Sequence, residues 1–364
     1  MYISSFTDLN RRKSNPTFDN LLKDTLCSFV RSQVLFVAIR LDLFTRIDQS
    51  PRRSLSLKQI LNLNIPLSMI SYLVYLRLIE RCPNSSDYQC THVTKNYLIS
   101  TGQNYVGLGI GVWDYRRQYK FFLRLKDTLQ FGRRVSEDDD TQANLWTIFE
   151  QKQDPMIYFA RIMSSFTRCT IDELCDHLNF SIYSTLLDVG GSLGELSRTM
   201  VERNPHLKAL SLDLPKVTTY ALESLTQHPN IKYIPGDFFD DSWPKEIIQQ
   251  WKSIDLVTLK YILHDWSLER RSYLVKKIYR LLKYKTDNFG GLGALIIIEK
   301  MIDTKRENIT ALLTSVSMAI ECGDGIGYDG TQDEYRKLLS EAGFQRIQLI
   351  SLMGPMVALL AHVV

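Results

Sequence analysis

The stretch Leu186-Leu187-Asp188-Val189-Gly190-Gly191-Ser192-Leu193-Gly194 decides the fold of this 364-residue chain. The apolar run from Thr185 to Val189 predicts a buried strand, and Glu195 to Val201 predicts a helix that starts directly after the glycines. Glycine in such a turn lets the backbone approach a ligand that a side chain would exclude, and the helix N-terminus adds unpaired N–H donors. The stretch therefore predicts a ligand-binding loop; a glycine-rich turn with a purely structural role is the alternative.

The loop departs from the dinucleotide-binding pattern. That pattern requires Gly-x-Gly-x-x-Gly, and Ser192 and Glu195 break the spacing. The acidic residue Asp188 precedes the glycines at the end of the strand, where it can hold a ligand's ammonium directly or through water. A ligand with a carboxylate, an ammonium and a sulfonium but no phosphate fits this arrangement. We therefore expect S-adenosylmethionine as the cofactor, bound in part at Gly190 and Gly191.

Composition and charge restrict the class of protein. The chain is 45% hydrophobic and 23% charged, which is ordinary for a soluble globular protein, and its length suits two domains. A net charge of +4 is too small to indicate a surface for nucleic acid or an anionic membrane. No apolar stretch reaches the length of a membrane span, no secretory signal is visible, and the six cysteines include no C-x-x-C pair. We expect a cytoplasmic protein with no bound metal and no membrane or nucleic-acid partner.

Residues 1–118 predict an amino-terminal domain of winged-helix type. A long helical pattern runs from Asn20 to Ile47, and its wide apolar face predicts burial in a partner subunit. Two short helices and a hairpin are expected over residues 56–91. The second of these helices, Leu67 to Leu78, carries no base-reading side chain before Arg77, so we expect it to pack against protein and not to enter a DNA groove.

Residues 119–364 predict an α/β domain of Rossmann-like type. A helical lead-in, 119–180, precedes the glycine loop, and Phe122, Tyr158 and Met163 within it are candidates to wall a flat substrate; ordinary helix core is the alternative. Beyond the loop, strands alternate with helices, which implies a parallel sheet. Strands are predicted at 185–189, 207–212, 231–234, 254–259 and 294–298, with two more, able to form a hairpin, at 345–349 and 356–362.

Ionisable side chains recur where these strands end, and ligands of open α/β sheets bind outside the carboxyl ends of the strands. Five such side chains are Asp188, Asp213, Asp237, His264 and Glu299. Asp213 can hold ribose hydroxyls or cap the helix that follows it. Asp237 with Phe238 can bind an adenine ring and its amino group. Lys260 can cover the other side of this pocket.

The pair His264-Asp265 predicts general-base catalysis. A phenolic hydroxyl has a pKa of about 10 and is a poor nucleophile until its proton is removed, whereas histidine, with an ordinary pKa of about 6.5, can accept a proton at cellular pH. A carboxylate on the other ring nitrogen would fix the tautomer. Glu299 and Asp329 are the available acids, because Asp265 is better placed to cap the next helix. The expected reaction is methyl transfer to a hydroxyl group.

Five motifs occur in an order that resembles a known family: Asp188-Val189-Gly190-Gly191, Asp213-Leu214-Pro215, Gly236-Asp237-Phe238-Phe239, Leu263-His264-Asp265-Trp266 and Glu341-Ala342-Gly343-Phe344. Together they resemble the S-adenosylmethionine-dependent O-methyltransferases of the plant caffeate and animal acetylserotonin class. The stretch Phe29 to Phe36 is similar to the acetylserotonin branch. The resemblance implies a homodimer built by the amino-terminal domain, and His264 as general base flanked by Glu299 and Asp329. The expected substrate is a small aromatic hydroxyl compound, N-acetylserotonin first and other phenols or hydroxyindoles next.

Two departures from the family pattern bear on activity. Ser192 stands where a third glycine is usual. The family's Gly-x-Glu-Arg-Thr is Gly327-Tyr328-Asp329-Gly330-Thr331 in this chain, so the second acid is one methylene shorter and the arginine is lost. A cofactor-binding but catalytically weak dimeric paralogue is therefore an alternative to an active enzyme.

Overall fold

A computed structural model describes residues 24–102, 105–107, 122–132, 135, 153–165, 167–321 and 329–364. These residues fall into two compact units, the first ending at residue 107 and the second starting at residue 122. The predicted boundary between residues 118 and 119 lies outside the described residues and stays a prediction. Within the described part, no helix combines the length and the apolar character needed to cross a membrane.

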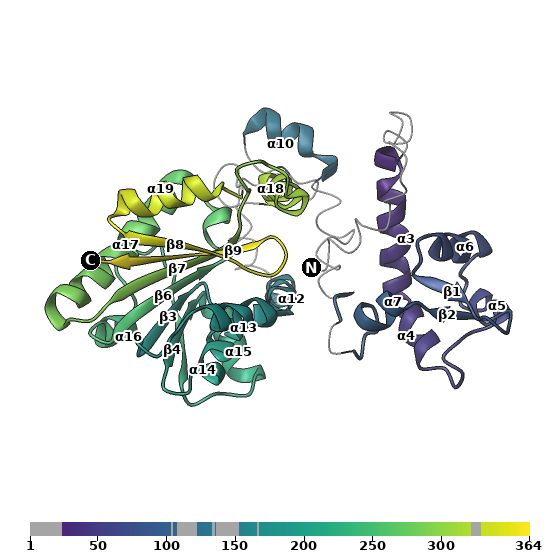
Figure 1. Cartoon of the computed structure of the whole chain (residues 1–364), viewed down its shortest axis with the longest axis horizontal. Coiled ribbons are helices and arrows are strands. Elements are labelled where there is room, and N and C mark those ends of the chain that lie inside the picture. The colour runs from purple at the N-terminus through teal and green to yellow at the C-terminus, as the bar shows by residue number, and fades with distance from the viewer. Residues whose placement is uncertain are drawn as a thin grey trace. The chain divides into compact units, whose positions relative to one another are not determined.

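The amino-terminal unit consists of short helices and one hairpin (Figure 1). Its two strands pair antiparallel. Two short helices followed by a hairpin is the order that the sequence predicts, and the first of them begins at a capping box in which Ser56 accepts the Gln59 N–H. The elements are α3 (Ser28–Arg40), α4 (Leu43–Asp48), α5 (Leu57–Leu61), α6 (Leu67–Tyr75), β1 (Ile79–Arg81), β2 (Tyr88–Cys90) and α7 (His92–Tyr97).

The continuous helix expected from Asn20 to Ile47 is wrong within the described residues, because turns at Cys27 and at Leu41–Asp42 interrupt it. Asp42 between α3 and α4 has a φ of +51°, and a left-handed residue cannot continue a right-handed helix. Apolar residues recur through both α3 and α4, which is why the sequence alone predicts one helix. Residues 20–23 lie outside the described part.

The carboxy-terminal unit is built on a seven-stranded sheet with the order β5-β4-β3-β6-β7-β9-β8. The first five strands are parallel, and β9 runs antiparallel to both β7 and β8. All seven predicted strands are present. They are β3 (Thr185–Val189), β4 (Lys208–Asp213), β5 (Ile231–Pro235), β6 (Ile254–Lys260), β7 (Gly293–Lys300), β8 (Gln345–Ser351) and β9 (Met356–Val363).

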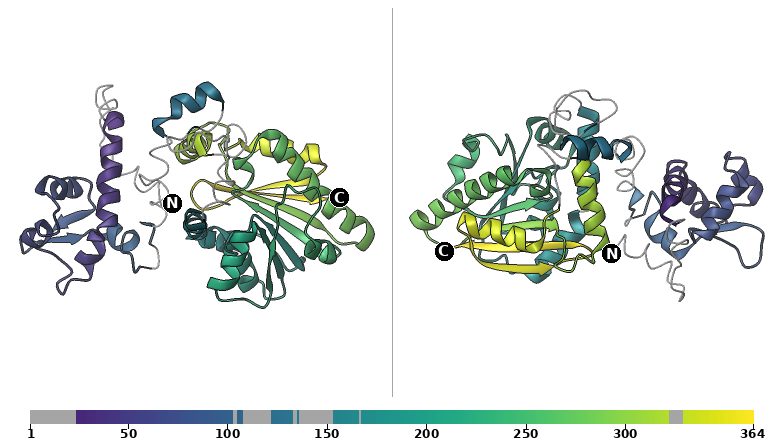
Figure 2. Two further views of the ribbon diagram at one scale, coloured as in Figure 1. Left: turned by 180° about the vertical axis from the view of Figure 1, so that it is seen from behind. Right: turned by 90° about the horizontal axis from the view of Figure 1, so that it is seen from above.

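Helices cover both faces of this sheet (Figures 1 and 2). Successive strand residues alternate between the two sides: Leu186 and Leu256 pack in one buried apolar cluster, while Leu187 and Val257 pack in the other. Parallel strands buried on both faces read as nearly continuous apolar runs, as Ala294–Ile298 of β7 does. One face carries α12 (Gln153–Ser165), α13 (Thr167–His177), α14 (Glu195–Arg203) and α15 (Pro215–Ser224); the other carries α16 (Lys245–Gln250), α17 (Leu268–Phe289) and α19 (Gln332–Ala342).

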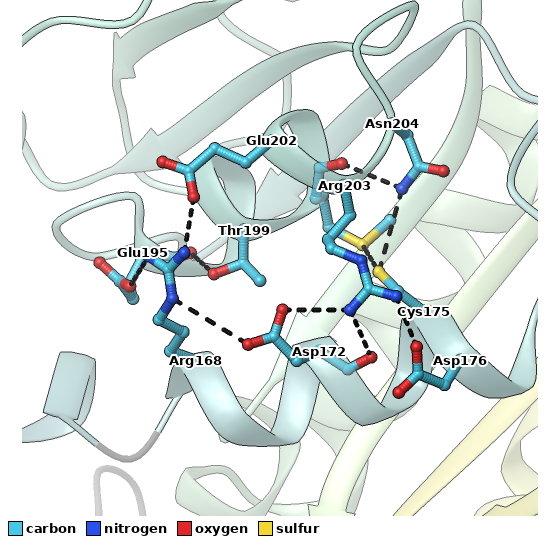
Figure 3. Close-up of polar contacts among 10 residues, drawn as sticks. Arg168, Asp172, Cys175, Asp176, Glu195, Thr199, Glu202, Arg203 and Asn204 are labelled. Atoms are coloured by element: carbon cyan, nitrogen blue, oxygen red, sulfur yellow. Dashed lines mark hydrogen bonds and ion pairs between the residues drawn. The ribbon is translucent and has the colours of Figure 1, made fainter. Parts of the chain in front are cut away.

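Ion pairs join α13 to α14 (Figure 3). Arg168 of α13 lies 2.8 Å from Glu202 and 3.7 Å from Glu195, and Arg203 of α14 lies 3.4 Å from Asp172. Each pair is partly exposed and contributes little by itself. Together they attach both ends of α14 to α13, and α14 is the helix that begins directly after the glycine loop.

Candidate active site

The sheet brings the predicted polar residues to one edge. Because β4, β3, β6 and β7 are adjacent and parallel, their carboxyl ends meet on the same side of the molecule. Asp213 closes β4, Lys260 closes β6, and Glu299 is the penultimate residue of β7. The glycine loop follows β3 at the centre of this edge, where β4 lies on one side and β6 on the other. An open α/β sheet binds its ligands at such a point.

The glycine loop packs too closely against neighbouring residues of the protein to accept side chains. The φ of Gly190 is +71°, and a Cβ there would lie 2.2 Å from Ile262 Cδ1. A Cβ on Gly191 would lie 2.2 Å from Ser211 Oγ. The N–H groups of Gly190 and Gly191 both donate to the Leu212 carbonyl, at 2.8 and 3.0 Å, which folds the loop across the end of β4. Only glycine fits at these two positions, as the sequence indicated.

Asp188 supports this loop from inside the sheet. Its side chain is buried, and its two oxygens accept hydrogen bonds from Thr258 Oγ1 at 2.9 Å and Ser197 Oγ at 3.1 Å. Burial raises the pKa of Asp188 to about 6, against the lowering effect of these hydroxyls. Because the Asp188 side chain is buried and its oxygens face Thr258 and Ser197, its surroundings favour the indirect of the two arrangements predicted for Asp188 and a ligand ammonium.

Asp213 links the glycine loop to the end of β4. One carboxylate oxygen accepts the Leu214 N–H and the other accepts the Ser192 N–H, each at 2.7 Å. The N-cap residue of α15 is Leu214, which makes no side-chain cap, so the structure does not use Asp213 as the helix cap. A carboxylate has about four acceptor sites, and two remain for ligand hydroxyls. Burial raises the pKa of Asp213 to about 6.

Asp237 and Phe238 follow β5 at the same edge. The exposed Asp237 accepts the Phe239 N–H at 2.8 Å, which fixes the turn. The Phe238 ring lies edge-on to Trp266, with centroids 6.1 Å apart. A Cβ built on Gly190 would lie 3.7 Å from this ring, so Phe238 stands beside the glycine loop. The turn therefore presents a carboxylate and an aromatic face close to the loop.

Lys260 is half-buried at the end of β6. Its Nζ lies 4.1 Å from the centroid of the Tyr261 ring. Burial lowers the pKa of Lys260 to about 7, although the carboxylates of Glu299 and Asp188 oppose this change. An anionic ligand group beside Lys260 would stabilise the charged form of its side chain.

His264 lies in a buried cluster of carboxylates. It occupies a short 3₁₀ turn, Leu263–Asp265, and its Nδ1 is 2.9 Å from Asp329 Oδ1 and 3.3 Å from Glu299 Oε2. Glu299 Oε1 accepts the N–H groups of Ile262 and Leu263, each at 3.1 Å. Glu299 thus holds the turn, and Asp329 orients the imidazole. The other ring nitrogen, Nε2, is 3.5 Å from Asp265 Oδ1, longer than a good hydrogen bond.

The cluster makes the imidazole strongly basic. Burial alone would lower the pKa of His264, but the charges of Glu299, Asp265 and Asp329 outweigh it and raise the pKa to about 9. Burial likewise raises the pKa of Glu299, against the pull of the imidazolium. Glu299 and Asp329 are both fully buried. A proton taken up at this histidine is therefore well stabilised.

Comparison with known proteins identifies the family. A model of the O-methyltransferase domain matches residues 122–345. The chain belongs to the O-methyltransferase family. A curated relative, acetylserotonin O-methyltransferase of Bos taurus, is 25% identical over 94% of this chain and 97% of its own length. The N,N-dimethyltransferase OxyT of Streptomyces rimosus is 25% identical over 87% of this chain and 88% of its own length.

A solved structure supports the same fold. Human N-acetylserotonin methyltransferase in complex with SAM matches with a TM-score of 0.83 at 23% identity, over 97% of this chain and 99% of its own. The predicted fold class, a Rossmann-like methyltransferase unit with an amino-terminal helical domain, is confirmed. The predicted cofactor, S-adenosylmethionine, agrees with that complex.

The two departures from the O-methyltransferase pattern have visible structural effects. Ser192 has a φ of +53°, the left-handed region in which a glycine would be unstrained. Asp329 reaches His264 at 2.9 Å even though its side chain is one methylene shorter than glutamate. The shorter acid therefore still orients the imidazole of this O-methyltransferase.

The predicted substrate wall is only partly described. Met163 is half-buried on α12, and Phe122 is half-buried shortly before α10 (Leu125–Phe131). The side chain of Tyr158 lies outside the described residues. These three positions stay predictions for the substrate pocket.

Several supporting residues escaped the sequence reasoning. The buried Arg271 of α17 donates to the carbonyls of Trp266 at 2.8 Å and His264 at 3.3 Å. Lys277, six residues later on α17, donates to the carbonyls of Phe238 and Asp240. Charged residues on the apolar side of an amphipathic helix are the signal that could have revealed them. Both hold backbone of the site in place.

One predicted cap is wrong. Asp265 was expected to cap the helix after the turn that carries His264, but Ser267 is the N-cap of α17 and accepts the Arg270 N–H. Asp265 instead directs its carboxylate toward His264 Nε2. Serine is as good an N-cap as aspartate, so the end of α17 does not need the Asp265 carboxylate as a hydrogen-bond acceptor.

Proposed function

We propose that this O-methyltransferase uses S-adenosylmethionine to methylate a hydroxyl group of a small aromatic substrate, with His264 as the general base. The observation that carries the proposal is the pairing of the His264 imidazole with Asp329 and Glu299 at the sheet edge that also holds the glycine loop. Because Nδ1 faces these two acids, we assign Nε2 as the nitrogen that takes the substrate proton.

The cofactor site is assigned to residues of the sheet edge. The residues present fit S-adenosylmethionine: a glycine loop at the carboxyl end of β3, acceptor sites on Asp213, and an aromatic ring at Phe238 beside the loop. When bound, S-adenosylmethionine supplies an electrophilic methyl group. Asp213 would hold the ribose hydroxyls, and Asp237 with Phe238 the adenine.

Proton transfer is the step that the protein's own residues perform. A phenol gives up its proton as its oxygen attacks, and Nε2 of His264 takes it. For this, the Nδ1 proton must stay on the side of Asp329, which the 2.9 Å contact secures. The buried charge of Glu299 stabilises the imidazolium that forms. The mechanism follows the usual pairing of a base with an orienting acid.

N-acetylserotonin is the first substrate to test. The likeness of Phe29 to Phe36 to the acetylserotonin branch motivates it, and bovine acetylserotonin O-methyltransferase is a relative of nearly equal length. Other phenols and hydroxyindoles come next. Because OxyT is an N,N-dimethyltransferase, amine acceptors belong in the same panel.

The test is incubation with methyl-labelled S-adenosylmethionine and this panel of acceptors. We expect label in the O-methyl product of at least one hydroxyindole or phenol. Label only in N-methyl products would contradict the hydroxyl assignment. Cofactor binding without transfer to any acceptor would favour the catalytically weak paralogue, whose motive was the shortened acid Asp329.

We also propose that the protein is a homodimer joined through its amino-terminal unit. Leu26, Phe29 and Val30, in and just before α3, are exposed to 64%, 54% and 41% within the single chain. Such an apolar stretch is costly in water and indicates a covered surface. Light scattering should give the mass of a dimer at micromolar concentration, and Phe29→Asp should shift it toward the monomer, with the exposed Lys58→Asp as control. A monomeric wild type would contradict the proposal. A cytoplasmic location and the absence of a nucleic-acid partner stay predictions.

A further inference from the structure

The loop that carries Asp237 and Phe238 follows the edge strand of the described sheet. It runs from Gly236, directly after β5, to Pro244, directly before α16. Because β5 ends the strand order, a strand neighbours it on one side, the side of β4. The Gly236 N–H donates to the Asp213 carbonyl at 3.0 Å, which attaches the start of the loop to β4. The rest of the loop needs a partner from outside the sheet.

Lys277 of α17 binds this loop at three places. The side chain is buried, with 6% of its surface exposed. Its Nζ donates to the carbonyls of Phe238, at 3.1 Å, and of Asp240. The same Nζ lies 4.2 Å from the centroid of the Trp243 ring. An ammonium has three N–H donors, and two carbonyls and an aromatic face can receive all three. One lysine thus attaches three residues of the loop to α17.

The loop and the buried ammonium depend on each other. Removing an ammonium from water is costly unless hydrogen-bond and charge partners replace the water. Burial lowers the pKa of Lys277. Carboxylates of the same loop oppose this change: Asp240, Asp237 and Asp241. The lysine therefore gains its compensation from this loop, and only a loop held in the observed conformation supplies it.

The bond to the Phe238 carbonyl bears on the two side chains expected to meet adenine. The Asp237 carboxylate accepts the Phe239 N–H at 2.8 Å, and the Asp237 carbonyl accepts the Asp240 N–H at 3.2 Å. Both bonds lie within the turn, so they shape it without attaching it to the rest of the unit. Lys277 attaches it to α17, whose apolar side chains pack in the same buried cluster as those of β6. The direction of the carboxylate and of the aromatic ring follows from this attachment.

We propose that Lys277 is a positioning residue that gives the cofactor site its preference for adenine over other purine bases. It holds the Asp237 carboxylate where the amino group of adenine can donate to it, with the Phe238 ring against the base. Lys277 acts through the loop and not through a contact of its own with the cofactor. The inference rests on the proposed assignment of Asp237 and Phe238 to adenine.

The test uses two ligands that differ only at the base: S-adenosylhomocysteine and S-inosylhomocysteine, in which an oxygen replaces the amino group. Calorimetry gives both Kd values for the wild type, for Lys277→Met, and for Lys276→Met, an exposed neighbour on α17 that serves as control. The wild type and the control should prefer the adenine ligand by about 10- to 100-fold, the worth of a hydrogen bond to a charged group. In Lys277→Met the preference should fall below about 5-fold, because the carboxylate is no longer held at the amino group.

The preference separates positioning from a general loosening of the fold. A loosened protein would bind both ligands more weakly by the same factor, so an unchanged preference in Lys277→Met would overturn the proposal. Lys277→Gln provides a second variant, since its shorter, uncharged amide keeps a polar group at the site but cannot bind both carbonyls. It should also lose preference, and a folded Lys277→Gln with the full preference would overturn the proposal equally.

Kinetics and a second position distinguish this inference from the function on which it rests. In Lys277→Met, KM for S-adenosylmethionine should rise while kcat stays nearly unchanged, the pattern of a lost binding interaction. A fall in kcat with an unchanged preference would overturn the proposal. A full preference in Asp237→Asn would refute the adenine assignment itself. Loss of preference in Asp237→Asn together with a full preference in Lys277→Met would overturn the role of Lys277 alone.

Discussion

Asp329→Asn separates charge from shape at the buried imidazole. The carboxylate lies 2.9 Å from His264 Nδ1, and the amide of asparagine has nearly the same size. At an effective dielectric constant of about 20, two unit charges about 4 Å apart interact with about 4 kcal/mol, and an opposite charge at this range moves a pKa by about 1 to 3. Removing the negative charge removes support for the imidazolium. The pKa of His264 should therefore fall from about 9 by about 1 to 3.

The assay is an NMR titration of the histidine ring carbons in the cofactor-free protein. His264→Gln assigns the resonance among the six histidines, and the exposed Asp241→Asn serves as a control that should leave it unmoved. Only the neutral imidazole can act as base, so wild-type activity should rise with pH and level off near pH 9, and the variant should level off at lower pH. A His264 pKa unchanged within 0.5 (roughly the error of a well-resolved titration), or raised, in Asp329→Asn would refute the reasoning.

Three further predictions concern the cofactor loop and the carboxylate cluster. Asp213→Ala should weaken S-adenosylmethionine binding by about 1–3 kcal/mol, because ligand hydroxyls and the Ser192 N–H lose their acceptor, whereas Asp241→Ala should not; calorimetry measures both, and equal affinities would remove Asp213 from the site. Ser192→Gly should raise the free energy of unfolding by about 1 kcal/mol because it relieves a left-handed backbone, and a lowered melting temperature would contradict this. A chelator should leave methyl transfer unchanged, because the proposed reaction uses His264, Glu299 and Asp329 for proton transfer and not as metal ligands. Their possible ligand atoms do lie within 4.8 Å of one another, so loss of activity on chelation would instead indicate a metal.

The sheet and the position of its polar residues could be predicted from the sequence alone. The strands are short apolar runs bounded by glycine or by charged residues, and parallel pairing then requires Asp213, Lys260 and Glu299 to share an edge. Local pattern and overall topology agree in this unit. For that reason the edge of the sheet that these polar residues share could be predicted from the sequence.

Other features depend on three-dimensional contacts that no local pattern records. The break at Asp42 lies within a stretch of recurring apolar residues, because one left-handed residue changes the helix axis without changing the sequence pattern. The inward orientation of Asp188 depends on Thr258, which is 70 residues away in the chain. The contacts of Arg271 with backbone carbonyls likewise follow from the packing of α17 against the turn that carries His264. Side-chain direction at a strand end is decided by tertiary partners.

The pKa of His264 shows the same limit. The sequence predicts Glu299 and Asp329 as the acids beside His264. Burial lowers the pKa of the imidazole and nearby carboxylates raise it, so the direction of the change depends on their distances. The structure places both acids within 3.3 Å of Nδ1, so the charges prevail.

The most direct test of the account is the rate of methyl transfer in His264→Ala, measured in a single turnover with labelled S-adenosylmethionine and a phenolic acceptor. The account predicts a fall of about 10²–10⁴ near pH 9, where the wild-type imidazole becomes neutral, and a smaller fall at pH 7, with nearly unchanged cofactor affinity. Raising the pH toward the phenol's own pKa of about 10 should partly restore the variant. Wild-type rates in His264→Ala near pH 9 would contradict the account and leave His264 as a structural residue.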